Sequence, residues 1–225
     1  MTMSRVNGVD RSVLEEVLEY GRRMLLDGLV IGTSGNISVR VPEGIVITPS
    51  TIPYEDISVE DLCLLDEDGN QLAGLGRPSA ETPMHMGVYH NSDAGAVVHT
   101  HSPVAVAVSA VVDELPAIHY GIAQFGGSNV RVAEYERFGS DALADATLRA
   151  FEGRRGVLLR NHGTTTYGAS LYEAYYRAQL LEWLATAFWQ ATTIGEPHII
   201  SESELEEVIA ESRRRRYGTA APPEG

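Results

Sequence analysis

The sequence predicts an α/β protein in which helices pack against a mixed β-sheet. Three observations support this fold class: helical and strand-like segments are interspersed, hairpin-like strand pairs come early, and strand–helix alternation follows. The 225 residues suffice for one substantial core, and no linker-like segment divides them. We expect one domain over residues 1–217 and a disordered tail at 218–225.

The N-terminal part is expected to contain one helix and two pairs of strands. An apolar stripe predicts a helix over residues 10–27. A glycine-containing turn leads into an alternating strand at 37–41, and a second strand at 44–48 closes a hairpin. Residues 62–65 and the turn at 66–70 predict another strand pair.

The rest of the chain is expected to alternate strands with helices. In order, we expect a capping loop at 78–82 and a helix to about residue 90, a strand at 94–101, a helix at 103–112, an irregular stretch to 127, a helix at 140–151, a strand at 156–160 and a long helix at 170–193. An acidic run at 202–211 followed by arginines at 213–216 predicts a last helix whose basic end opposes its dipole.

Composition limits the classes of function. With 17 basic and 31 acidic residues, the net charge of −14 argues against binding to nucleic acid or to an anionic membrane. No apolar stretch is long enough to span a bilayer, and the N-terminus lacks a signal-peptide pattern, so we expect a cytoplasmic protein. The single cysteine, Cys63, has no partner for an intramolecular disulfide and is expected in the core.

The most specific motif is His99-Thr100-His101 at the end of an apolar segment. Side chains at positions i and i+2 of a strand share a face, so His99 and His101 can point at one place. His162 would complete a site whose three nitrogens leave a zinc-like ion with an open position, as catalytic sites do. The alternative is that these are hydrogen-bonded core histidines.

These histidines belong to an ordered series of motifs. Over essentially the whole chain, the series resembles the class II aldolase and adducin-head family, and within it most closely the L-fuculose-phosphate aldolases. The motifs are Thr33-Ser34-Gly35-Asn36, Ile47-Thr48-Pro49-Ser50, Pro78-Ser79-Ala80-Glu81, His99-Thr100-His101, Ile118-His119-Tyr120 and Asn161-His162-Gly163.

The resemblance implies a three-layer αβα sandwich with a central mixed, largely antiparallel sheet, assembled as a homotetramer with active sites between subunits. It implies that His99, His101 and His162 bind Zn²⁺, or another divalent ion such as Mn²⁺ or Co²⁺, and that Glu81 is the catalytic carboxylate. Tyr120 and Tyr217 resemble catalytic tyrosines that a neighbouring subunit contributes. The positions that resemble phosphate-binding residues are Gly35, Asn36, Thr51 and Ser79.

The implied reaction is cleavage of a ketose 1-phosphate similar to L-fuculose 1-phosphate, giving dihydroxyacetone phosphate and an aldehyde. A divalent ion would stabilise the enediolate as a Lewis acid, and Glu81 would move the proton. Glu81 also opens a helix, where a carboxylate favours the dipole, so a capping role is the alternative. Two positions depart from the aldolase pattern: Ala80 replaces a usual serine, and Thr51 replaces a usual glycine.

Other activities of the same family remain open. A pentulose-5-phosphate 4-epimerase is disfavoured, because those enzymes resemble this chain with Asp in place of Glu81. A metal-dependent decarboxylase or dehydratase would use the same stabilisation of an enolate by the ion, so these activities are alternatives to the aldolase. The expected substrate is therefore either a sugar phosphate or a related anion. A non-catalytic interaction domain would not need three His and one Glu in these positions.

Overall fold

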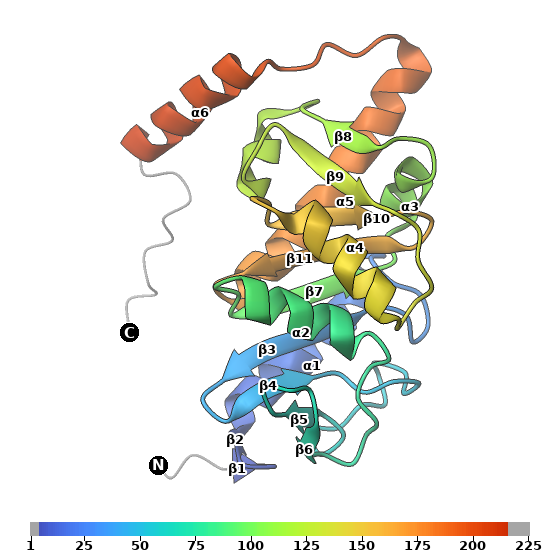
Figure 1. Ribbon diagram of the computed structural model, residues 1–225, viewed down its shortest axis with the longest axis vertical. Coiled ribbons are helices and arrows are strands. Elements are labelled where there is room, and N and C mark those ends of the chain that lie inside the picture. The colour runs from blue at the N-terminus through green and yellow to red at the C-terminus, as the bar shows by residue number, and fades with distance from the viewer. Residues whose placement is uncertain (1–4, 216–225) are drawn as a thin grey trace.

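The computed structural model describes residues 5–215, and within this range the chain forms a nine-stranded sheet (Figure 1). Its strands are β3 (Asn36–Val41), β4 (Gly44–Ile47), β5 (Cys63–Leu65), β6 (Gln71–Ala73), β7 (Ala96–Thr100), β8 (Glu114–Pro116), β9 (Asn129–Ala133), β10 (Gly156–Leu159) and β11 (Gly163–Gly168). Their order across the sheet is β6-β5-β4-β3-β7-β11-β10-β9-β8. Neighbouring strands run antiparallel except β9 and β10, so the expected mixed, largely antiparallel sheet is confirmed.

Helices cover both faces of the sheet (Figure 1). One face carries α2 (Thr82–Asn91) and α4 (Asp141–Phe151), and the other carries α1 (Arg11–Leu26), α3 (Pro103–Ser109) and α5 (Leu171–Ile194). Strand β7 shows the division, because Val97 joins the core under α2 and α4 while Val98 joins the core under α1 and α5. The expected three-layer αβα sandwich is therefore confirmed.

A short hairpin, a 3-10 helix and a last α-helix complete the described chain. A hairpin of β1 (Arg5–Val6) and β2 (Val9–Asp10) precedes α1, and the 3-10 helix η1 (Tyr120–Phe125) follows β8. Helix α6 (Glu202–Arg215) comes last and contributes Leu205 to the core beside α5. Among the described residues, no helix is both long and apolar enough to cross a membrane.

Side-chain caps explain where the best-predicted helices begin. The carboxylate of Asp10 accepts a hydrogen bond from the backbone N–H of Ser12 at the start of α1. Ser140 and Ser170 accept backbone hydrogen bonds in the same way at the starts of α4 and α5. The helices expected at 10–27, 140–151 and 170–193 are confirmed.

Several elements differ from the expectation. The polar segment 164–166 lies within β11, a central strand, because its threonine hydroxyls form buried hydrogen bonds. The stretch expected to be irregular up to 127 contains β8 and η1, and the helix expected at 103–112 ends at Ser109. In the alternating strand expected at 37–41, the polar Ser38 is buried as well, because helices cover both faces of this strand. The tail 218–225 and Tyr217 lie outside the described residues.

Candidate metal centre

Four segments converge at one edge of the sheet and bring the expected metal ligands together. His99 lies near the end of β7, and His101 is the first residue beyond that strand. Because β3 runs antiparallel to β7, Asn36 at the start of β3 pairs with His99. The turn that joins β10 to β11 carries His162, and Glu81 occupies the N-cap position of α2.

The backbone fixes the orientation of the two strand-end histidines. Nδ1 of His99 lies 2.9 Å from the carbonyl oxygen of Thr164, which can only accept, so Nδ1 carries the proton and donates. In the neutral ring, Nε2 of His99 then carries the lone pair, which points away from this bond. The backbone N–H of His101 donates to the carbonyl oxygen of Leu29 at 3.0 Å, which anchors the chain just after β7.

The backbone conformation of the turn that carries His162 depends on the residue on either side of it. Asn161 has a φ of 55°, a left-handed conformation that asparagine tolerates better than most residues. Gly163 follows, and a Cβ atom at that position would lie 2.0 Å from the carbonyl oxygen of Thr100. The Asn-His-Gly order therefore allows a tight turn that holds the imidazole of His162 against β7.

Glu81 is at the N-cap of α2, but its side chain forms no capping hydrogen bond. Its backbone N–H donates to Oγ of Ser79 at 3.2 Å, and its carboxylate is buried and turned towards the histidines. The capping interpretation of this side chain is therefore not what the structure shows. The carboxylate is directed at the site instead.

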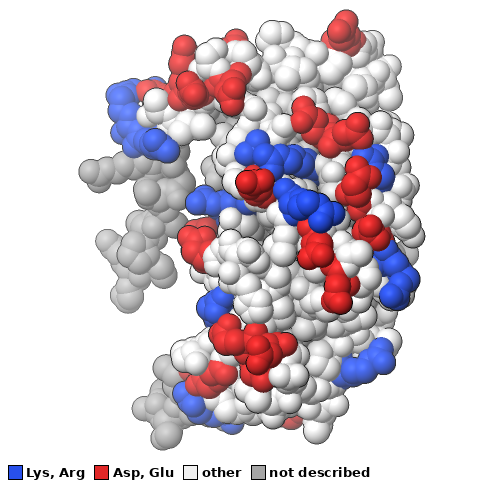
Figure 2. Space-filling model, viewed as in Figure 1, with Lys and Arg blue, Asp and Glu red and all other residues white. Residues whose placement is uncertain are grey.

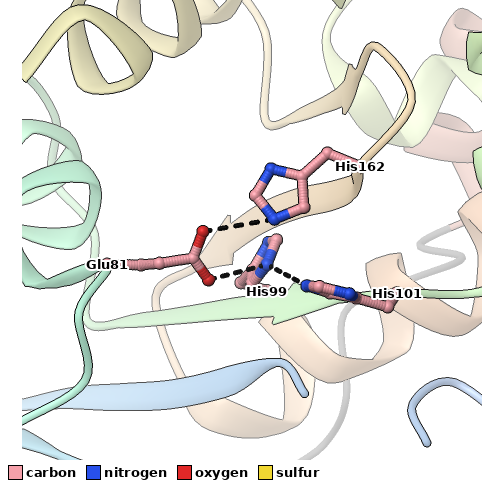
Figure 3. Close-up of side chains that lie close together, drawn as sticks. All are labelled: Glu81, His99, His101 and His162. Carbon is pink, nitrogen blue, oxygen red and sulfur yellow. Dashed lines mark hydrogen bonds and ion pairs between the residues drawn. The ribbon is translucent and has the colours of Figure 1, made fainter. Parts of the chain in front are cut away.

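Figure 3 shows Glu81 and the three imidazoles facing one another. Oε2 of Glu81 lies 2.9 Å from Nε2 of His99, and Oε1 lies 3.3 Å from Nε2 of His162. Nε2 of His101 lies 2.9 Å from Nε2 of His99. The imidazole rings are 4.8 to 4.9 Å apart between centroids, and one ligand atom from each of the four residues lies within 4.8 Å of all the others.

The protonation states of the side chains in this cluster favour the binding of a metal cation. Burial, together with the neighbouring imidazoles, lowers the pKa of His101 to about 3 and that of His162 to about 4, so both rings are neutral at pH 7. Burial acts to raise the pKa of Glu81, but interactions with the neighbouring imidazoles of His99 and His162 and the hydrogen bond from Asn36 lower it overall. The carboxylate is therefore ionised beside two neutral rings.

These residues fit a divalent metal ion. With its proton on Nδ1, His99 places a nitrogen lone pair 2.9 Å from another imidazole nitrogen and from a carboxylate oxygen, an arrangement that a central cation would stabilise. Oε1 of Glu81 is buried and accepts no hydrogen bond from the described residues. Zinc binds imidazole nitrogen at about 2.0–2.1 Å and carboxylate oxygen at about 2.0–2.2 Å, which suits donors gathered this closely.

The expected phosphate contacts lie at the border of this cluster. Gly35 has a φ of 73°, and a Cβ atom there would lie 2.7 Å from the carbonyl oxygen of His99. Ser79 contacts the backbone of Glu81, and the amide of Asn36 donates to Oε2 of Glu81 at 3.0 Å. The structure thus brings three of the four residues to the cluster.

Thr51, the fourth expected phosphate contact, is exposed and has a φ of 67°. This conformation is rare for a β-branched side chain and is natural for the glycine usual at this position. Its neighbour Ser50 bonds to the loop before α2: Oγ of Ser50 accepts from the N–H of Ala80 and donates to the carbonyl oxygen of Pro78. Thr51 therefore follows a loop that is tied to the start of α2.

Tyr120 lies elsewhere in this chain. It opens η1, its ring packs on His119 with 4.1 Å between centroids, and it lines a groove formed with α5 and α6. The cluster of Glu81 and the three histidines is separate from this groove. The second expected tyrosine, Tyr217, lies outside the described residues.

The structure adds His85, Ser38 and Tyr89, which the sequence analysis did not single out. His85 is fully buried, and its Nε2 lies 2.5 Å from Oδ1 of Asn36. Its position four residues after Glu81 on the same helix was the available signal, because positions i and i+4 share a helix face.

Acidic and arginine side chains are interspersed on the face of the molecule shown in Figure 2. The net charge of −14 is therefore not offset by a broad basic surface on that face. For an anionic ligand, attraction must come from local donors and a bound cation rather than from the overall field.

The chain is similar to a known protein family and to several known proteins. Residues 15–189 match the family described as "Class II Aldolase and Adducin N-terminal domain". The chain is 42% identical over 195 residues to a 5-deoxy-D-ribulose 1-phosphate aldolase of Bacillus thuringiensis serovar kurstaki, covering 85% of this chain and 91% of that protein. It is 35% identical over 206 residues to a 5-methylthioribulose-1-phosphate/5-deoxyribulose-1-phosphate aldolase of Rhodospirillum rubrum, covering 91% and 92%.

A solved structure of an L-fuculose 1-phosphate aldolase is also similar, with a TM-score of 0.87 and 35% sequence identity. The match covers 92% of this chain and 98% of that one. The chain therefore belongs to the class II aldolase and adducin N-terminal domain family, in which its full-length similarity is to aldolases, enzymes of the lyase class.

Proposed function

We propose that the protein is a metal-dependent aldolase that cleaves a ketose 1-phosphate between C3 and C4 to dihydroxyacetone phosphate and an aldehyde. The observation that carries this proposal is the buried cluster of His99, His101, His162 and Glu81, with neutral imidazoles beside an ionised carboxylate. The full-length similarity to aldolases of ketose 1-phosphates supports the same reaction.

In this mechanism His99, His101 and His162 would hold the metal ion, and we propose Zn²⁺, with Mn²⁺ or Co²⁺ as substitutes. The ion supplies a Lewis acid for the negative charge that cleavage leaves on the ketose fragment. Glu81 lies beside the ligands and exchanges the proton of the dihydroxyacetone phosphate fragment. Gly35 and Ser79, at the border of the cluster, contribute to holding the phosphate.

The sequence contains no lysine to act as the nucleophile of a Schiff-base aldolase, the other common type of aldolase. A Schiff-base aldolase needs a lysine amine, and all 17 basic residues counted as Lys or Arg are arginine. We therefore propose that a metal cation stabilises the negative charge left on the ketose fragment.

For the substrate, we propose a 5-deoxypentulose 1-phosphate ahead of L-fuculose 1-phosphate. Identity is 42% to an aldolase named for 5-deoxy-D-ribulose 1-phosphate and 35% to the one named for L-fuculose 1-phosphate. Both substrates share the phosphorylated ketose end and end in a methyl group, so the same metal centre serves either. They differ in the length of the aldehyde released.

We also propose a homotetramer in which Tyr120 and Tyr217 of one subunit complete the site of another. Tyr120 is 55% exposed and lines a groove away from its own metal cluster, which supports a role towards a second copy of the chain. There it would stabilise the alkoxide that develops on the aldehyde side.

The test is a panel of substrates given to the zinc-loaded protein: 5-deoxyribulose 1-phosphate, L-fuculose 1-phosphate and a pentulose 5-phosphate. Release of dihydroxyacetone phosphate is followed, with Glu81→Gln as the matched inactive control. We expect cleavage of the 1-phosphates, fastest for the 5-deoxypentulose. Interconversion of the pentulose 5-phosphates would instead select an epimerase, and no reaction with any sugar phosphate would overturn the proposal.

A further inference from the structure

A row of buried hydrogen bonds leads from α2 and β3 to Glu81. The hydroxyl of Tyr89 lies 2.9 Å from Oγ of Ser38, which lies 2.6 Å from Nδ1 of His85. Nε2 of His85 lies 2.5 Å from Oδ1 of Asn36, whose Nδ2 lies 3.0 Å from Oε2 of Glu81. All five side chains are buried.

The direction of every bond in this row follows from its last member. An amide oxygen and a carboxylate oxygen would repel each other at 3.0 Å, so the amide group of Asn36 that faces Oε2 of Glu81 is the NH₂ group. Oδ1 of Asn36 therefore faces His85 and accepts from Nε2–H.

The same reasoning continues to the other end of the row. Burial lowers the pKa of His85 to about 3, so the ring is neutral and carries one proton. With that proton on Nε2, Nδ1 of His85 is an acceptor, and the hydroxyl of Ser38 must donate to it. Oγ of Ser38 then accepts from the hydroxyl of Tyr89. Every proton in the row points towards Glu81.

The consequence is a difference between the two oxygens of Glu81. Oε2 receives the hydrogen bond from Asn36 and lies beside His99, whereas Oε1 is buried, lies 3.3 Å from Nε2 of His162 and receives no hydrogen bond from the described residues. Hydrogen bonding to a carboxylate oxygen reduces its basicity, so Oε1 is the more basic oxygen.

We infer that His85 is a positioning residue that acts through the amide of Asn36, fixing the carboxylate of Glu81 so that Oε2 is anchored and Oε1 exchanges the substrate proton. This inference rests on the proposed function for the proton transfer, but the direction of the row does not. Two roles of Asn36, contact with the phosphate and positioning of Glu81, can then be told apart by kinetics. Loss of a phosphate contact would raise KM, whereas loss of positioning would lower kcat.

The kinetic test compares two substitutions of His85 in the full-length, zinc-loaded protein. His85→Leu removes the donor to Asn36, and we expect kcat to fall about 10-fold to 100-fold with KM changed less than about 2-fold. His85→Gln keeps an N–H donor near the position of Nε2 and should recover most of kcat. His90→Leu is the control, because His90 is an exposed residue of the same helix.

Three kinetic results would overturn the inference: unchanged kcat in His85→Leu, a Gln variant as slow as the Leu variant, or an effect confined to KM. A variant that loses activity only because it is poorly folded is identified by comparing its zinc content and melting temperature with those of His90→Leu.

A spectroscopic test applies to the wild-type protein and does not depend on turnover. In a sample with ¹⁵N-labelled histidine, long-range ¹H–¹⁵N correlations should show His85 as the neutral Nε2–H tautomer, unchanged between pH 5 and pH 8. A protonated Nδ1 would reverse the row and overturn the inference, even if the protein cleaves ketose phosphates. The expected tautomer with no cleavage of any substrate would instead reject the proposed function and leave the row intact.

Discussion

The metal cluster and the groove beside η1 differ in how much of their surroundings one chain provides. Around the cluster, Glu81 and His99 are buried, and hydrogen bonds from Asn36 and to Thr164 orient them. Along the groove and the exposed side of α5, large aromatic side chains face outward: Tyr120 is 55% exposed and Trp183 50%. One chain thus builds the candidate metal cluster by itself, whereas its described residues leave an aromatic surface uncovered.

The difference has a physical basis. Buried polar groups need partners, and the cluster supplies them from four segments that the antiparallel sheet brings to one edge. Exposed aromatic residues gathered on one surface are typical of a surface that binds something else. The proposed tetramer assigns a second copy of the chain to that surface.

The largest effect is expected from removing a metal ligand. His99→Ala or His162→Ala should abolish both metal binding and activity, because each ring contributes one of three imidazole nitrogens. Metal analysis after dialysis measures this, with His90→Ala as the control because His90 is an exposed histidine. Retention of a full equivalent of metal by either variant would show that the cluster is not the ion site.

The next largest effect separates holding the ion from moving the proton. Glu81→Gln should keep the metal and lose about 10³-fold in kcat, because an amide cannot exchange a proton as a carboxylate does. Metal content and steady-state kinetics are measured on the same preparation. If turnover is unchanged, the acid–base role of Glu81 is wrong.

A smaller effect tests the groove. Tyr120→Phe should lower kcat about 10²-fold without changing metal content, and Tyr172→Phe in the same groove should have little effect. If sites are shared between subunits, mixed tetramers of Glu81→Gln and Tyr120→Phe chains should recover about a quarter of wild-type activity, since random mixing leaves a quarter of the sites intact. No recovery on mixing would contradict a shared site.

The smallest effect concerns the neutral histidines of the metal-free protein. His101 and His162 have pKa values of about 3 and 4 when folded, below the value of about 6.5 for the unfolded chain. The unfolded state therefore binds protons first as the pH falls, and stability should decrease from about pH 6.5 to pH 4. The melting temperature measures this decrease. A constant or rising melting temperature over that window would mean that these rings are not held neutral.

Local patterns were enough to predict much of the fold and two of the histidines that the structure brings together. The helix 10–27 and the histidine pair each follow from residues close in sequence. Strand β11 was not predicted, because its threonines are polar residues. They can be buried because their hydroxyl groups form hydrogen bonds, such as the one between Thr100 and Thr164. Such partners are distant in sequence.

The residues next to Glu81 in the sequence left two orientations of its side chain open. Its helix-start position favours a capping side chain, and only the approach of Asn36 from β3 and of the histidines from β7 and the β10–β11 turn directs the carboxylate elsewhere. His85 was missed for the same reason, since its partner Asn36 lies 49 positions away.

The most direct measurement titrates metal-free protein with Zn²⁺ while following the release of dihydroxyacetone phosphate from 5-deoxyribulose 1-phosphate. We expect no release from the metal-free protein and full activity at one equivalent of zinc per chain. Turnover without metal, or no release from any ketose 1-phosphate by the fully loaded protein, would contradict the account.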